Sequence, residues 1–295
     1  FALPDSPIAR RLPSGSAEVI RTAPVARLRA LYDAYYRPER ATLVVVGDVD
    51  VAAMERKIRN RFADWQGRGA AGSPLDFGSV AVDRPTAADI YVQPDLPETV
   101  AIELLKPIIA EPDSRARRLQ RSLEGIGTSI LSRRLRTMAL APDARFIRAS
   151  FGITAVFDRF LDINLSAVAQ DGQWQPAMEA VDLAYRQFLQ FGVSEAEIAE
   201  QVADIRTSLD NGVRGAETRE SAGLASGIVG TLSNRRSYAT PIWVRDLFNS
   251  YVADITPETV MAAVRQRVAG SSPPLVRVTS KQNVAGGEAA ILAAF

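Results

Sequence analysis

The stretch FIRASFGITAVFDRFLDINLSAVAQ (residues 146–170) decides the fold. Apolar side chains take every second position on both sides of Asp158-Arg159, and the residues between them are mostly polar or small. The apolar positions are Ile147, Ala149, Phe151, Ile153, Ala155 and Phe157 before the turn, and Leu161, Ile163, Leu165, Ala167 and Ala169 after it. Such alternation is typical of strands with one buried face. The stretch therefore predicts an antiparallel hairpin whose apolar face lies against a core.

The residues around the hairpin predict further strands and a run of helices. Three more strands are predicted at 89–93, 99–106 and 273–279. Apolar residues at helical spacing predict helices over 113–138, 174–188, 194–209, 216–232, 243–251 and 257–268. We therefore predict an α+β fold, in which helices pack on one face of an antiparallel sheet.

The first 65 residues predict an incomplete unit. Helices are predicted over 24–36 and after Asp50, which can serve as an N-cap. Between them, residues 41–46 form an apolar, β-branched run that predicts a strand. A strand that is apolar on both faces needs neighbours on both sides, and no other convincing strand occurs among residues 1–65. We expect this part to be the end of a domain whose beginning is missing.

The composition between these units sets the expected domain boundaries. Residues 66–86 are rich in Gly, Ala, Ser and Pro and lack apolar periodicity, as linkers do. We expect the C-terminal part of a first domain at 1–70, a linker at 71–86, a complete second domain at 87–280, and a connector to a following domain at 281–295.

The composition also excludes several classes of protein. The chain has 295 residues, of which 47% are hydrophobic and 23% charged, so it has enough apolar material for a core. Its formal net charge of +1 gives no net field to hold a nucleic acid, and we expect no nucleic-acid partner. We also expect no membrane span, because the apolar runs fall far short of the roughly 20 residues needed.

Two residue types are missing altogether. The sequence contains no histidine and no cysteine. This excludes an imidazole general base, the Ser-His-Asp and Cys-His nucleophile systems, and zinc sites built from imidazole or thiolate. No glycine precedes a lysine, so a P-loop is absent as well. We expect no catalytic residue, no metal ligand and no cofactor in this chain.

Four stretches, in this order and spacing, resemble the pitrilysin/insulinase family of zinc metallopeptidases, which includes the mitochondrial processing peptidases. They are YDAYYRPERATLVVVGD (32–48), FADW (62–65), SILSRRLR (129–136) and GVSEAEI (192–198). The resemblance covers residues 5–280 and implies the metallohydrolase fold of that family. It implies that 87–280 is the family's second, non-catalytic domain.

The resemblance also implies where the family's chemistry lies. Its zinc is held by a His-x-x-Glu-His helix upstream of the region that corresponds to 32–48, together with a distant glutamate. None of this occurs here, so zinc is expected only in the parent protein. The family also uses an Arg and a Tyr from its far half, at positions corresponding to Arg136 and to the strand at 145–157. That strand carries Phe146 and no tyrosine, so the assisting role does not transfer.

The helix predicted over 113–138 is rich in arginine. Arg117, Arg121, Arg133 and Arg136 are candidates for contacting a peptide through its acidic groups. The alternative is a solvated helix face whose arginine stems cover apolar neighbours. Gly125 and Gly127 on the same helix favour close helix packing over a phosphate loop, because no third glycine and no preceding strand accompany them.

These observations lead to a functional hypothesis with two alternatives. The chain is predicted to be a non-catalytic segment of a zinc metalloendopeptidase that forms part of a peptide-enclosing chamber and hydrolyses nothing alone. One alternative is an inactive scaffold or assembly subunit of the same fold, and the other is a binding module for acidic peptides. The expected partners are the other domains or half of the peptidase and a peptide substrate. The resemblance implies a bacterial protein and favours the periplasm over the cytoplasm.

Overall fold

The computed structural model describes residues 2–3, 6–10, 15–74 and 76–295, and it divides the chain into two compact units. Unit 1 comprises Phe1–Pro4, Ser79–Arg214 and Ala239–Phe295, and unit 2 comprises Asp5–Gly78 and Gly215–Tyr238. Among the described residues, no helix has the length and apolar character needed to cross a membrane. The boundaries expected at 70, 86 and 280 stay predictions.

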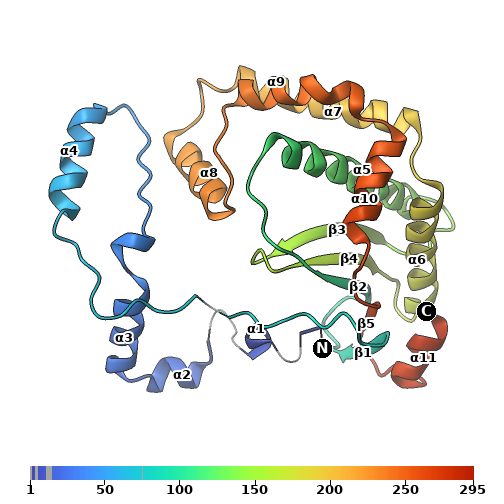
Figure 1. Cartoon of the computed structure of the whole chain (residues 1–295). Coiled ribbons are helices and arrows are strands. Elements are labelled where there is room, and N and C mark those ends of the chain that lie inside the picture. The colour runs from blue at the N-terminus through green and yellow to red at the C-terminus, as the bar shows by residue number, and fades with distance from the viewer. Residues whose placement is uncertain (1, 4–5, 11–14, 75) are drawn as a thin grey trace. The chain divides into compact units, whose positions relative to one another are not determined.

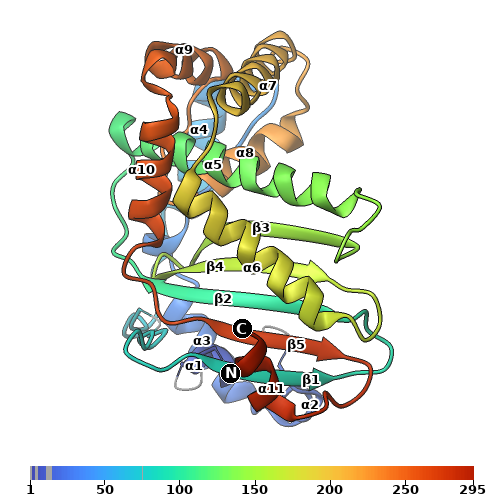
Figure 2. The ribbon, with the colours of Figure 1, turned by 90° about the vertical axis from the view of Figure 1, so that its right-hand side faces the viewer.

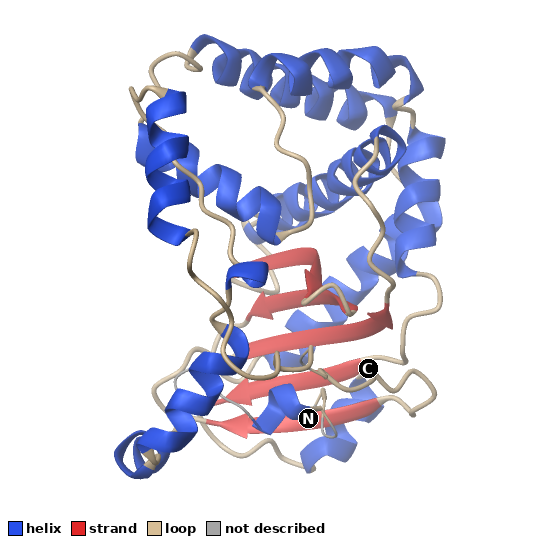
Figure 3. Cartoon of the chain, turned by 60° about the vertical axis from the view of Figure 1, so that its left-hand side comes forward, coloured by secondary structure: helices blue, strands red, loops and turns tan. Residues whose placement is uncertain are grey.

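Unit 1 is built on a five-stranded sheet, whose strands are red in Figure 3. The strand order is β1-β5-β2-β4-β3 (Figure 2). Its strands are β1 (Ala87–Val92), β2 (Thr99–Pro107), β3 (Arg148–Val156), β4 (Phe160–Val168) and β5 (Leu275–Ser280). The predicted hairpin is confirmed as the antiparallel pair of β3 and β4, in which Phe151 lies opposite Leu165. The expectation of an antiparallel sheet is wrong for one pair, because β5 enters between β1 and β2 and runs parallel to β1.

Helices cover one face of this sheet, which confirms the predicted α+β class (Figures 1 and 2). They are α5 (Arg115–Ala139), α6 (Trp174–Phe191) and α11 (Gly287–Ala294), and α10 (Pro257–Val268) packs against α5. Two more helices, α7 (Glu195–Arg214) and α9 (Pro241–Tyr251), pack against α5 and each other, and a short 3₁₀ turn, η2 (Val252–Asp254), follows α9. Helix α11 lies in the expected connector and places Ile291, fully buried, in the core.

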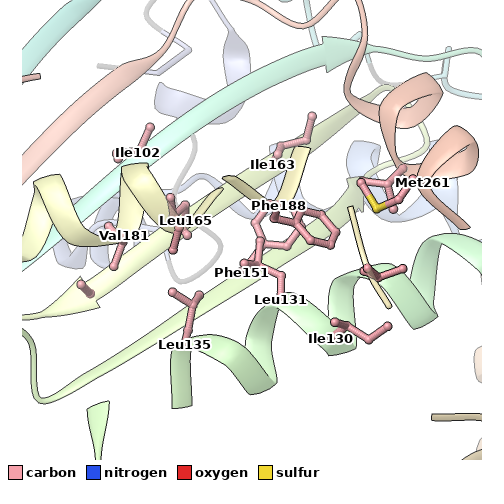
Figure 4. Close-up of a cluster of buried hydrophobic side chains, with 14 of the residues drawn as sticks. Ile102, Ile130, Leu131, Leu135, Phe151, Ile163, Leu165, Val181, Phe188 and Met261 are labelled. Carbon is pink, nitrogen blue, oxygen red and sulfur yellow. The ribbon is translucent and has the colours of Figure 1, made fainter. Parts of the chain in front are cut away.

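The core lies between the sheet and these helices. Figure 4 shows side chains of β2, β3 and β4 meeting those of α5, α6 and α10. The labelled members are Ile102, Ile130, Leu131, Leu135, Phe151, Ile163, Leu165, Val181, Phe188 and Met261, all buried. Burying a side chain of this size stabilises the fold by about 1.5–3 kcal/mol. The alternating apolar side chains of the hairpin thus form one side of the core, and the apolar side chains at helical spacing form the other.

Unit 2 is mostly helical. It contains α1 (Pro7–Arg10), α2 (Ala17–Thr22), α3 (Val25–Tyr35), η1 (Pro38–Arg40), α4 (Val51–Phe62) and α8 (Ser221–Ser233). The helices predicted after Pro24 and Asp50 are confirmed. The strand predicted at 41–46 is wrong: the segment belongs to no sheet, because the described part of unit 2 offers it no partner strand.

The end of α3 is held by Arg37, one of the few buried residues of unit 2. Its Nη1 donates to the carbonyl oxygens of Asp33 (3.1 Å), Arg68 (2.9 Å) and Gly69 (3.1 Å). The backbone N–H of Gly72 also donates to the carbonyl of Ala34 at 2.9 Å. Polar contacts, not an apolar core, thus hold residues 68–72 against this helix.

Candidate functional site

Helix α5 presents the candidate arginines. The Ser114 hydroxyl caps its first turn by accepting from the backbone N–H of Arg117 at 3.1 Å. One face of the helix is buried in the core, through Leu123, Ile126, Gly127, Ile130, Leu131 and Leu135. Because this face is committed to packing, the arginines project from the remaining faces.

The first group of arginines surrounds two buried carboxylates. Asp113, whose side chain is 6% exposed, lies 2.5 Å from Nη2 of both Arg118 and Arg121. Arg118 also covers the ring of Trp243, with its guanidinium carbon 4.9 Å from the ring centroid. Charge-assisted contacts of this kind fix both arginines against the start of α5.

Glu124, whose side chain is 11% exposed, lies between two further arginines. Arg117 Nη1 is 3.8 Å from one carboxylate oxygen, and Nε of Arg267 on α10 is 3.3 Å from the other. Arg117 also lies 3.5 Å from exposed Glu111. Nearby, Lys106 at the end of β2 donates to the carbonyl oxygens of Gln266 and Arg267 at 2.9 and 3.1 Å. Burial lowers the pKa of both Arg267 and Lys106.

The second group joins α5 to α7. Arg133 pairs with Glu200 and, at 3.1 Å, with Asp204. Arg134 donates two hydrogen bonds to Glu197, at 2.7 and 2.8 Å, and one to the carbonyl of Gly192 at 3.0 Å. The guanidinium of Arg134, together with the N–H and hydroxyl of Ser194, holds the pKa of Glu197 at about 2. Arg133 and Arg134 therefore have a structural role here, because their ion pairs attach α5 to α7.

Arg136 differs from the other candidates. Its side chain is exposed, and it pairs with no other residue in the part of the chain that the structure describes. It lies close to Arg133, but 16 residues of helix put about 24 Å between Arg117 and Arg133. The structure therefore places the four predicted residues in two separate groups and ties three of them to carboxylates. Their contact with a peptide stays a prediction.

The glycines of α5 serve packing, as predicted. A Cβ on Gly127 would lie 2.5 Å from Val264 Cγ2, so this glycine lets α10 approach α5 closely. Gly125 faces open space. A phosphate-binding loop has no place in this continuous helix.

The acidic residues of the chain are mostly structural. Asp50 caps α4 by accepting from the N–H of Ala53 at 2.8 Å, and Glu197 forms a capping box with Ser194. On the sheet face opposite the helices, burial raises the pKa of Glu103 and Asp162, and the charge of Asp162 further raises that of Glu103. The described residues contain no group of three or more acidic side chains close enough to hold a metal ion.

The sequence analysis missed Lys106 and Arg267. Both lie near the arginines of α5 only after β2 and α10 have packed around that helix. The one available signal was the pair Arg265 and Arg267 in the last turn of α10, which is also what the helix dipole favours.

Comparison with known proteins decides the family. The profile described as the Peptidase M16 inactive domain matches residues 23–204. The chain belongs to this family. The suggested resemblance to insulinase-type peptidases is thereby confirmed, and the matched M16 domain is an inactive one. A comparison with curated proteins finds no match.

Solved structures agree with the M16 fold. The chain is similar to the first half of the periplasmic protease PqqL from Escherichia coli, with a TM-score of 0.82 and 18% identity over 96% of this chain and 61% of that one. A second structure of PqqL gives the same TM-score and identity over 96% of this chain, but only 32% of that chain is covered. A predicted insulinase family protease from Yersinia pestis gives a TM-score of 0.75 and 15% identity over 96% of this chain and 60% of that one. The chain therefore spans between 32% and 61% of the length of these relatives.

Proposed function

We propose that this chain is a non-catalytic segment of a zinc metalloendopeptidase and forms part of the chamber that encloses a peptide. The observation that carries the proposal is the match of residues 23–204 to the inactive domain of the M16 family. The composition supports it, because a sequence without histidine cannot supply imidazole ligands to zinc. Zinc is therefore proposed for the parent protein only.

Unit 2 supports an origin in a larger protein. None of the residues of α2, α3, α4 or α8 is buried. Large apolar side chains such as Val25 (81% exposed) and Leu28 (56%) on α3 face solvent, as does Leu43 (58%) in the unpaired segment 41–46. Exposed apolar surface of this extent is typical of protein contacts. We infer that another part of the protein covers these side chains and supplies a strand to pair with residues 41–46.

The relatives support a proposal for the compartment and the substrate. PqqL is a periplasmic protease, and we propose the periplasm for this chain as well. The proposed substrate is a peptide, and the proposed partners are the remaining domains of the peptidase.

A hydrolysis assay tests the inactivity of the chain. We expect the purified chain, incubated with Zn²⁺ and an unfolded peptide, to release no product. Turnover that persists in the presence of chelators would overturn the proposal, because the chain would then contain its own catalytic centre.

An inactive scaffold of the same fold is distinguished by the rest of the parent protein. A peptidase needs His-x-x-Glu-His in a preceding domain or a partner subunit. Its presence in the native complex, together with zinc measured by elemental analysis, supports the peptidase. Its absence supports the scaffold.

A further inference from the structure

The first group of arginines contains more positive charge than its carboxylates can neutralise. Asp113 is shared by two arginines, and Glu124 is shared by two others. With Lys106 and Glu111 included, five cationic side chains meet three carboxylates. The group therefore has a formal excess of two positive charges in partly buried surroundings, where charge is costly.

Two of these arginines also have unused donors. The side chains of Arg117 and Arg267 are 19% and 16% exposed, and both lie near Glu124 without a hydrogen bond to any described residue. Nε of Arg267 is fully buried. A guanidinium carries five N–H donors and cannot lose its proton at ordinary pH. Since Nε of Arg267 is buried beside Glu124, an acceptor from outside the chain would bind the remaining N–H donors of these two partly exposed side chains.

The surroundings favour a negatively charged acceptor. Arg117 occupies the first turn of the 25-residue helix α5, where the helix dipole is positive. Lys106 and Arg121 add charge nearby, and Arg121 remains partly exposed. In the second group of arginines, by contrast, Arg134 already donates to the carboxylate of Glu197 and to the carbonyl of Gly192.

We propose that Arg117 and Arg267, supported by Lys106 and Arg121, form a binding site for an oxyanion. We call these four residues the oxyanion site. Two guanidinium groups from different helices can each present paired N–H donors to a carboxylate or a phosphate. Glu124 lies between the two arginines, 3.8 Å from Arg117 Nη1 and 3.3 Å from Arg267 Nε. The site goes beyond the proposed function and does not depend on it.

Calorimetric titration of the full chain at constant ionic strength tests the site. One arm uses inorganic phosphate, and the other uses a short glutamate-containing peptide with an amidated C-terminus. We expect saturable binding of one anion per chain. Arg117→Gln and Arg267→Gln should each weaken it at least tenfold, or about 1.4 kcal/mol. Binding in both arms indicates a general oxyanion site, and binding of the peptide alone indicates a site for peptide carboxylates.

Arg148→Gln is the matched control, because it removes one charge from unit 1 at an exposed position at the start of β3, where the arginine pairs with no described residue. It should leave binding unchanged. Circular dichroism verifies folding, and if Arg267→Gln does not fold, Arg117→Gln and Lys106→Gln decide the question. The proposal is overturned if neither probe binds, in which case water satisfies these donors, or if Arg148→Gln weakens binding as much as Arg117→Gln does. Failure here leaves the hydrolysis and zinc results untouched, so the two proposals fail separately.

Discussion

The two units of this chain use apolar residues in opposite ways. In unit 1, the alternating residues of the hairpin and the apolar faces of α5, α6 and α10 meet in one continuous core. In unit 2, helices of similar amphipathic pattern bury none of their residues. The comparison teaches that a helical pattern alone does not make a domain, because each apolar face needs a second surface to cover it. The predictions below test this difference, from the largest expected effect to the smallest.

The largest difference between the two units is expected in the loss of stability when a leucine is truncated. Leu131 is fully buried, so Leu131→Ala should lower the free energy of unfolding by about 2–5 kcal/mol. Leu31→Ala on α3 removes the same atoms from a side chain that is more than half exposed, and should change stability by less than about 0.5 kcal/mol. Urea denaturation followed by circular dichroism measures both. Equal losses would contradict the difference between the units.

The next largest effect on stability is expected from the ion pair of Arg134 on α5 and Glu197 on α7. Glu197→Gln should destabilise unit 1 by about 1.5–3 kcal/mol at pH 7, because it weakens two charge-assisted bonds from Arg134. The pKa of Glu197 is lowered from 4.5 to about 2, so its stabilisation is fully present above pH 4.5 and is lost as the pH falls toward 2. The free energies of unfolding of the wild type and the variant, measured across this pH range, should converge as the pH falls toward 2. A difference that is independent of pH would refute the assignment.

Helix glycines should respond oppositely to an added methyl group, depending on whether a neighbouring element packs against them. Gly127→Ala should cost unit 1 about 1–3 kcal/mol, because the added methyl meets Val264 on α10. Gly227→Ala in α8 meets nothing within 4 Å and should favour the helix by about 0.5–1 kcal/mol. Gly125→Ala, in open space on α5, is the control within unit 1 and should favour its helix as Gly227→Ala does. Thermal unfolding monitored by circular dichroism gives the sign of each change.

The smallest effect on stability is expected at Asp162, on the sheet face of unit 1 opposite the helices. Burial raises the pKa of Asp162, so its contribution to stability is greatest when it is protonated and falls as the pH rises through the raised pKa. Asp162→Asn should abolish this loss of stability with rising pH and raise the free energy of unfolding at pH 7 by up to about 1 kcal/mol. The gain should vanish at low pH, where the wild-type carboxyl is neutral. A variant less stable than the wild type at pH 7 would contradict this account.

Much of unit 1 could be predicted from the sequence, because periodicity reports which face of an element is buried. The hairpin, α5 and the capping box at Ser194 are such cases. The parallel course of β5 could not be predicted, since strand pairing over 188 residues, as between Asp89 and Arg277, depends on the whole topology. The unpaired segment 41–46 was mistaken for a strand because its composition reports β-propensity and not the presence of a partner. The oxyanion site likewise joins residues of three elements, and only its α5 members stood out in the sequence.

Amide hydrogen exchange of the isolated chain tests the central claim most directly, since it reports local stability along both units in one experiment. We predict slow exchange in β2, β4, α5 and α6, and fast exchange throughout α3, α4 and residues 41–46. Protection in α3 and α4 equal to that in α5 would show that unit 2 is stable by itself, and would contradict the claim that its apolar faces lack a covering surface in the isolated chain.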